Sequence, residues 1–335
     1  MAATIHDVAR LAGVAISTVS KVMSDSGRIS EQTRTRVRDA MQQLDYHPSR
    51  HARGLARNCS DTIGVLMPLQ RNSAFANPYV FEILCGIERY CASQHYSVLL
   101  LDADALQQEP KSVARLVAER KVDGVILHAD DKAPALLRQF SEHDLPHLVI
   151  GRQPGPHSWV DIDNRHAGQL ATQHLLQQGY RRLQFVGNHA ADTISADRLA
   201  GFAQTLAEQG LAPHAPALFA TGGQYGEAAA LWQQLRQQPT LPDALLVAGN
   251  PLAAGLLAAA QHDGLNIGPT LGIASFDNYP YAEQTQPPLS VVDIDLFALG
   301  EQAARELFLQ LAKPSRLVQS LLLEMQLFAR PSSQR

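Results

Sequence analysis

Several polar side chains stand in segments that follow apolar runs typical of buried strands. These residues are Asn77, Arg152, Arg198, Asn250 and Asp277. In open α/β sheets the carboxyl ends of neighbouring strands share one edge, and ligands bind there. An arginine and an aspartate that face each other in a mostly apolar cleft can each bond two neighbouring hydroxyl groups. The set therefore predicts a site for a polyhydroxylated ligand, although each residue alone is more typical of a loop or a structural ion pair.

The motifs of nucleophilic, phosphate-binding and redox chemistry are missing from the sequence. It contains no G-x-S-x-G, no G-x-x-x-x-G-K-[ST] and no C-x-x-C. Residues 161–164 place two acids at alternate strand positions, but they lack the glycine and distal glutamate of a calcium loop. The histidines do not cluster at metal-binding spacings. We therefore predict that the protein is not an enzyme and holds neither a metal nor a cofactor.

A second group of candidate residues lies between Thr4 and Met23, where the pattern predicts two short helices and a tight turn. Thr4 can cap the first helix, and Gly13 ends it because glycine adopts a left-handed backbone without strain. The apolar residues predicted to pack inward are Ile5, Val8, Leu11, Ala12, Val14, Val19, Val22 and Met23. The outward side chains of the second helix are then Ile16, Ser17, Ser20 and Lys21. This layout indicates a helix-turn-helix, although an ordinary surface pair of helices would share it.

The first sixty residues carry the positive charge of the chain. Ser30 is predicted to cap a third helix, 31–44, that closes a small core over the first two. Residues 1–60 hold nine Lys or Arg and five Asp or Glu, a net charge of +4, whereas the remainder carries −8. A basic head on an acidic body favours a polyanionic partner for the head.

Residues 49–58, with the sequence SRHARGLARN, form a linker with helical spacing. An isolated helix of this length is marginal in water. We expect the segment to fold only when two copies pack together in a DNA minor groove, where Leu55 would insert between base pairs. A plain flexible linker with an incidental leucine explains the same residues.

From residue 62 onward, apolar runs of strand length alternate with amphipathic helical stretches. The predicted strands are 62–68, 97–103, 123–128, 146–151, 159–163, 182–187, 217–220, 243–249, 270–277 and 289–295. The predicted helices are 79–95, 110–120, 134–143, 164–178, 195–209, 224–237, 251–263 and 296–312. Such alternation gives parallel sheets covered by helices on both faces. There are too many strands for one ordinary sheet, so the sequence predicts two similar α/β halves with a cleft between them.

Cysteine usage and hydropathy indicate the compartment. Cys59, Cys85 and Cys91 are too few and too scattered for a disulfide framework, which fits a reducing environment. The amino terminus lacks the apolar run of a signal peptide, and no stretch approaches ~18 consecutive apolar residues. We therefore expect a cytoplasmic protein without a membrane partner.

The order of these motifs resembles the LacI/GalR family of transcriptional regulators. The resemblance rests on IHDVARLAGVAISTVSKVM and RISEQTRTRVRDAMQQLDYHPSRHARGLA, and it continues through TIGVLMP, NPYVFEILCGIE, VDGVILH, VDIDN, SADRLAGF, FDNY and PPLSVV. It implies an α/β protein with an all-α headpiece and a periplasmic-binding-protein-like core. The implied domains are a helix-turn-helix headpiece at 1–48, a hinge helix at 49–61 and a core at 62–335. The implied core subdomains are 62–162 with 292–320, and 163–291 with 321–330.

The resemblance also implies a homodimer that binds a near-palindromic operator and responds to a small effector. Ile16, Ser17 and Lys21 would contact base edges in the major groove. The full DNA-binding set is Thr4, Ile16, Ser17, Thr18, Ser20, Lys21, Arg28, Leu55 and Ala56. The implied effector set is Phe75, Asn77, Arg152, Arg198, Phe219, Asn250 and Asp277. The function implied is a repressor controlled by a sugar or glycoside; a purine-like or phosphorylated effector, or a plain sugar-binding protein, are the alternatives.

The sequence departs from the family pattern at a few positions. Lys21 stands where arginine is common, and a lysine contacts guanine as a point donor with softer discrimination than an arginine fork. Gly249-Asn250 replaces an Asn-Asp or Ser-Asp pair, which removes a carboxylate from the expected effector site. No heptad repeat follows Phe328, so we expect a dimer rather than a tetramer.

Overall fold

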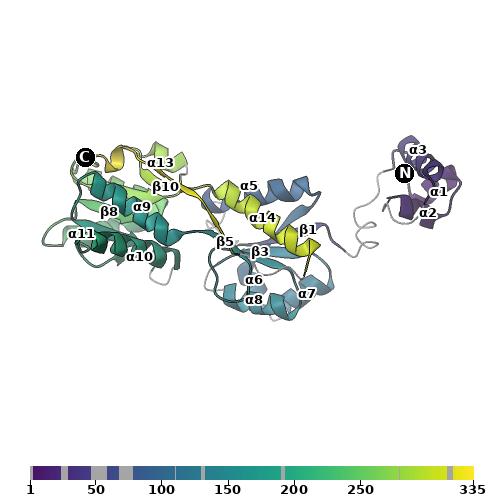
Figure 1. Cartoon of the computed structure of the whole chain (residues 1–335), viewed down its shortest axis with the longest axis horizontal. Coiled ribbons are helices and arrows are strands. Elements are labelled where there is room, and N and C mark those ends of the chain that lie inside the picture. The colour runs from purple at the N-terminus through teal and green to yellow at the C-terminus, as the bar shows by residue number, and fades with distance from the viewer. Residues whose placement is uncertain are drawn as a thin grey trace.

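The computed structural model describes residues 3–23, 29–46, 59–67, 78–109, 111–129, 133–189, 193–278, 280–314 and 320–335. Three helices form the headpiece, and two α/β halves form the core (Figure 1). The predicted mixed α/β fold class is confirmed. Residues 49–58 of the predicted hinge, 49–61, lie outside the described residues.

The headpiece contains the three predicted helices, α1 (Ile5–Ala12), α2 (Ile16–Met23) and α3 (Glu31–Gln43). Its core is built around Val8, Val19 and Val37, which are fully buried. The prediction for Leu11 was wrong, because its side chain is 50% exposed. The buried stripe of α1 runs through Val8, Ala9 and Ala12, which turns Leu11 to the outer edge of the helix.

The first half of the core is a six-stranded parallel sheet in the order β11-β5-β4-β3-β1-β2. Its strands are β1 (Thr62–Met67), β2 (Ser97–Asp102), β3 (Gly124–His128), β4 (His147–Ile150), β5 (Trp159–Ile162) and β11 (Ser320–Leu323). Alternate residues of a strand face opposite sides. Ile63 and Val65 pack under α5 (Pro78–Ser93) and α14 (Leu296–Ala312). Leu66 faces the other layer, which is formed by α6 (Ala103–Gln108), α7 (Ser112–Ala118) and α8 (Ala133–Glu142).

The second half repeats this arrangement with the order β12-β10-β9-β8-β6-β7. Its strands are β6 (Leu183–Gly187), β7 (Leu218–Phe219), β8 (Ala244–Val247), β9 (Gly272–Phe276), β10 (Ser290–Ile294) and β12 (Met325–Phe328). Only β12 is antiparallel to its neighbour. One face packs on α9 (Asn164–Gln177) and α10 (Thr193–Glu208), and the other on α11 (Ala228–Arg236) and α12 (Asn250–His262). Short helices η1 (Tyr225–Glu227), α13 (Pro280–Gln284) and η2 (Pro331–Ser333) complete it.

The chain passes between the halves three times, after β5, after β10 and between β11 and β12. The subdomain bounds expected at 292 and 320 therefore fall inside strands. β10 pairs with β9 and belongs to the second sheet, and β11 pairs with β5 in the first. The sheet changes at Asp295 and Glu324 instead, because edge pairing is decided by neighbouring strands distant in the sequence.

The predicted core strands and helices are all present with bounds shifted by a few residues, whereas α6, α13, β11 and β12 were missed. The predicted helix at 224–237 begins as η1 and continues as α11. Among the described residues, no helix has both the length and the apolar character needed to cross a membrane.

Candidate DNA-binding headpiece and effector cleft

The first helix of the headpiece begins at a well-formed cap. The Asp7 carboxylate accepts hydrogen bonds from the Thr4 N–H at 3.0 Å and from the Thr4 hydroxyl at 2.7 Å. These bonds lower the pKa of Asp7. Gly13 ends α1 with φ of +64°, a backbone conformation that glycine adopts without strain. Cap and turn together fix the angle at which α2 leaves the first helix.

The second helix presents the predicted DNA-facing residues to the exterior. Val19 and Val22 are buried against α1 and α3, whereas Ile16, Ser17 and Lys21 are exposed. Of the remaining set, Thr4 is exposed, and Thr18 and Ser20 are half-buried. An exposed isoleucine beside a serine and a lysine offers both apolar and hydrogen-bonding contacts to base edges. Arg28, Leu55 and Ala56 lie outside the described residues.

Arg198 lies at the centre of the second half's carboxyl edge and is only 4% exposed. Its Nε donates to Asn164 Oδ1 at 3.0 Å, and its Nη1 donates to the Ala248 carbonyl at 2.6 Å. The guanidinium carbon also lies 4.0 Å from the centre of the Phe276 ring. The guanidinium is thus held by two neutral acceptors and an aromatic face.

Close packing of two helices places this arginine. A Cβ on Gly168 of α9 would lie 2.2 Å from the Arg198 carbonyl oxygen on α10, and one on Gly201 would lie 1.9 Å from the Arg165 carbonyl oxygen. Only glycine permits this approach, so α10 lies directly on α9. The contact brings Arg198 beside Asn164, the first residue of α9.

Asn250 and Asp277 stand at the ends of the neighbouring strands β8 and β9. Both are buried, and Asn250 Nδ2 donates to the Asp277 carbonyl at 2.7 Å. Asp277 adopts a positive φ of 69°, a conformation that aspartate tolerates better than most residues. Among the described residues, no hydrogen-bond partner reaches the buried Asn250 Oδ1. Three of the predicted effector residues thus share this edge.

An ion pair crosses from the first half to the second. Arg152, which follows β4, donates from Nη2 to both carboxylate oxygens of Asp197 on α10, at 2.9 and 2.7 Å. The Arg152 N–H also donates to Asp161 at 2.7 Å. Burial raises the pKa of Asp161, although hydrogen bonds from the backbone oppose the shift. A cavity of about 360 Å³ opens here; its lining includes Arg152, Trp159, Asp161, Asn164, Thr193 and Asp197.

A second cavity, of about 250 Å³, adjoins the carboxyl edge of the first sheet and is mostly apolar. Its lining includes Met67, Ile83, Ile126, His128, Ile150 and Tyr79. Tyr79 Oη lies 2.9 Å from His128 Nε2, which pairs the two polar groups with each other. The first half therefore offers a mostly apolar surface where the second half offers polar groups.

Comparison with known proteins identifies the family. Residues 4–49 match the lacI family of bacterial regulatory proteins, and residues 172–333 match the periplasmic binding protein-like domain. The chain is 30% identical over 304 residues to the transcriptional repressor PurR of Vibrio cholerae serotype O1 (strain M66-2), which covers 90% of this chain and 89% of that protein. This chain belongs to the LacI family. It is a DNA-binding transcriptional regulator with an effector-binding domain, and not an enzyme.

Other relatives extend the comparison. The regulator MalR of Streptococcus pneumoniae serotype 4 (strain ATCC BAA-334 / TIGR4) is 34% identical over 62% of this chain and 63% of its own. A solved complex of the regulator CelR with cellobiose has a TM-score of 0.73 at 26% identity, and it covers 98% of this chain and 99% of its own. The Lac repressor dimer bound to operator and an anti-inducer has a TM-score of 0.84 at 24% identity over both full chains, which shows the shared fold.

Within this LacI-family core, the predicted effector residues divide into four groups. Arg198, Asn250 and Asp277 share the edge of the second sheet, and Arg152 lies across the cleft. Phe219 is half-buried and packs over Gly187, where a Cβ would lie 2.4 Å from the ring. Phe75 and Asn77 lie outside the described residues.

Sequence reasoning missed Asn164, Asp197 and Asn188 as parts of the cleft. Asn164 stands in the motif VDIDN and Asp197 in SADRLAGF, so the family resemblance could have marked both. Asn188 follows β6 and explains the unusual glycine at 249. A Cβ on Gly249 would lie 2.4 Å from Asn188 Oδ1, so the Asn188 side chain occupies the space that a larger residue would need.

Proposed function

We propose that this LacI-family regulator binds an inverted-repeat operator as a homodimer and that a neutral sugar or glycoside, held between the two halves of its core, controls the binding. The observation that carries the proposal is the buried polar edge formed by Arg198, Asn250 and Asp277. An arginine, an amide and a carboxylate at one edge of a cleft offer both donors and acceptors to neighbouring hydroxyl groups.

The charges already present favour a neutral ligand over a phosphorylated one. The Arg152 guanidinium is bound by Asp197, and the Arg198 guanidinium donates to Asn164 and to a backbone carbonyl. A phosphate would have to displace these acceptors and approach the nearby carboxylates of Asp161 and Asp277, which repel it. The buried oxygen of Asn250, which has no partner among the described residues, can instead accept a hydrogen bond from a ligand hydroxyl group.

The headpiece supports the operator part of the proposal. Ile16, Ser17 and Lys21 share the exposed side of α2 above a packed core. Base contacts from such a set add about 4–10 kcal/mol of specificity to the salt-dependent affinity for phosphates. Leu55 as a minor-groove wedge remains a prediction from the sequence. Because operator DNA lies in the bacterial cytoplasm, the proposal places the protein there.

Control would arise from coupling between the cleft and the paired headpieces. An effector that binds one closure of the two halves better than another shifts the spacing of the two hinges in a dimer. Such coupling is typically about 1–3 kcal/mol and is reciprocal, so operator DNA should change effector affinity by the same factor.

The test combines duplex selection with a ligand panel. Full-length protein should select an inverted repeat from a random duplex pool, and size-exclusion chromatography with light scattering should show a dimer. Thermal shift should then respond to a neutral mono- or disaccharide, which should also change affinity for the selected duplex. A response to purine bases or sugar phosphates alone would refute the neutral-sugar proposal, and a strictly monomeric protein would refute the dimeric one.

A further inference from the structure

One carboxylate clamps the chain where it enters the first sheet. Asp123, just before β3, accepts hydrogen bonds from the Ser60 N–H at 2.7 Å, the Ser60 hydroxyl at 3.0 Å and the Asp61 N–H at 2.9 Å. The Asp61 carbonyl accepts from the Ser97 N–H at 2.9 Å, and Asp61 has a positive φ of 49°. Charge-assisted bonds and a fixed left-handed residue give Ser60 and Asp61 one orientation on the sheet.

The residues around the clamp are held by their own hydrogen bonds. Ligand atoms of Cys59, Asp61 and Asp123 lie within 4.8 Å of one another. The Cys59 thiol donates to Asp61 Oδ1 at 3.3 Å. Burial raises the pKa of this thiol, and the bond to Asp61 raises it further. Both Asp123 oxygens and Asp61 Oδ1 already accept hydrogen bonds, so these residues form a hydrogen-bonded joint at the entry to the first sheet.

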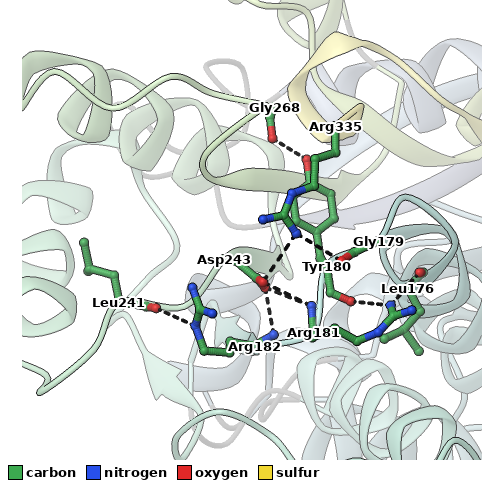
Figure 2. A network of polar contacts seen from close by, with 9 residues as sticks. All are labelled: Leu176, Gly179, Tyr180, Arg181, Arg182, Leu241, Asp243, Gly268 and Arg335. Atoms are coloured by element: carbon green, nitrogen blue, oxygen red, sulfur yellow. Dashed lines mark hydrogen bonds and ion pairs between the residues drawn. The ribbon is translucent and has the colours of Figure 1, made fainter.

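The second half contains the same device at an equivalent position. Asp243, just before β8, accepts hydrogen bonds from the Arg182 N–H at 2.7 Å and the Arg181 N–H at 3.1 Å, immediately before β6 (Figure 2). It is 3% exposed and also lies 3.7 Å from the Arg335 guanidinium. In both halves, a carboxylate just before the third strand in chain order thus binds the residues just before the first strand. Asp123 binds residues at the start of the core, whereas Asp243 binds residues between two elements of the core.

The two clamps differ in what precedes them in the chain. Arg181 and Arg182 follow α9, whose packing holds them in place independently of Asp243. Ser60 and Asp61 instead lie at the end of the hinge, which the family resemblance places at 49–61. Asp123 binds the last two residues of that segment, Ser60 and Asp61, so a rotation of the first sheet can be transmitted to the segment through this carboxylate.

We propose that Asp123 is the positioning residue that couples the first half of the core to the DNA-binding end of the chain. The inference rests on the proposed function, because it presupposes a specific duplex. Without the clamp, Ser60 and Asp61 gain freedom, so the core no longer dictates how the two headpieces of a dimer are spaced. Specific binding needs a fixed spacing of the headpieces. Binding to random DNA depends on phosphate contacts, which tolerate a change in that spacing.

The experiment compares matched variants of the full-length protein on two duplexes. One duplex is the inverted repeat that the wild-type protein selects, and the other is a scrambled duplex of equal length. Fluorescence anisotropy gives the ratio of the two affinities. Asp123→Ala should lower this ratio about tenfold, since it removes bonds to a charged acceptor. Asp123→Asn retains one acceptor oxygen and should lower the ratio less.

Asp243→Ala is the matched control, because it removes the equivalent clamp from the more buried position. It should lower the thermal midpoint at least as much as Asp123→Ala while leaving the affinity ratio unchanged. The inference would be overturned if both alanine variants kept the wild-type affinity ratio, or if both lowered it equally. Should Asp123→Ala fail to fold, Asp123→Asn decides by the same ratio. A wild-type protein that selects no inverted repeat overturns the proposed function and this inference with it.

Discussion

The two sheets have equivalent strand orders, but their carboxyl edges differ in polarity. In the second half, Arg198, Asn250 and Asp277 meet where β8 and β9 end. In the first half, the equivalent strands β3 and β4 end beside an apolar cavity, where His128 pairs with Tyr79. The same scaffold thus places buried polar side chains at this edge in the second half, whereas in the first half a mostly apolar cavity lies beside the exposed Arg152.

The strands themselves do not explain this difference, because the central strands β3, β4, β8 and β9 are mostly buried in both sheets. Helix pairing is also shared: Gly86 and Gly300 bring α5 onto α14, as Gly168 and Gly201 bring α9 onto α10. The halves diverge only in the residues that follow the strands, where packing places fewer demands on side-chain type. Four predictions test how far this division of roles holds.

The largest effect should come from matched core substitutions in the two sheets. Ile273→Ala removes a fully buried side chain from β9 and should lower the free energy of unfolding by about 3–5 kcal/mol. Ile150→Ala in the equivalent strand β4 borders an existing cavity, so it should cost only about 2–3 kcal/mol. Denaturant titration followed by circular dichroism measures both. Equal losses would show that the cavity leaves the packing of Ile150 intact.

The next effect concerns the polar edge. Arg198→Ala should weaken binding of the sugar that gives the largest thermal shift by about 100-fold, because a buried charged donor is lost. Binding to the selected duplex should persist. Arg165→Ala removes an exposed arginine of α9 that bonds Gln204, and it serves as the control. Calorimetry that finds normal sugar affinity in Arg198→Ala would remove this residue from the site.

A smaller effect should appear with acid. Burial lowers the pKa of His147 and His157 below the ordinary value of 6.5. His147 Nδ1 donates to the Leu145 carbonyl, and its Nε2 accepts from His157 Nδ1 at 3.0 Å. The unfolded chain binds protons more readily at these sites, so their contribution is complete above pH 6.5 and is lost as the pH falls below it.

The acid effect is measured as the thermal midpoint at pH 7.5 and pH 5.5. His147→Leu should narrow the difference between the two values. His174 in the second half is also buried and has a lowered pKa, so some acid sensitivity should remain in the variant. An unchanged difference would exclude His147 as a source of the acid sensitivity.

The smallest effect should come from the ion pair between the halves. Arg152 is 62% exposed, so the bond to Asp197 should contribute below about 1 kcal/mol to stability. Asp197→Asn should therefore leave the thermal midpoint almost unchanged but alter sugar affinity a few-fold, because it frees Arg152 at the cleft. Sugar affinity identical to that of the wild-type protein would exclude a role for this pair in the site.

Much of the fold could be predicted from local pattern. The caps at Thr4 and Ser30 and the left-handed Gly13 marked the headpiece helices, because these signals act over a few residues. The alternation of strands and helices marked both core sheets. The strands β11 and β12 were missed because they are short edge strands within one apolar segment, and only their distant partners separate them.

The arrangement of the candidate effector residues was predicted in part. Arg198, Asn250 and Asp277 were selected because they follow strands, and the structure brings them to one edge. Their detailed contacts could not be read from the sequence, since they depend on backbone oxygens such as that of Ala248. The exposed Leu11 shows the same limit, because helical spacing does not say where the neighbouring helices lie.

The sequence by itself determined the family, the helical headpiece and the two α/β halves, because capping, periodicity and motif order are local properties of the chain. Only the tertiary structure decided that Arg198 lies between Asn164 and Ala248, and that Asp123 and Asp243 hold equivalent positions. These contacts join residues that are far apart in the chain. Their geometry follows from the close approach of glycine-lined helices and from strand register, neither of which a single segment encodes.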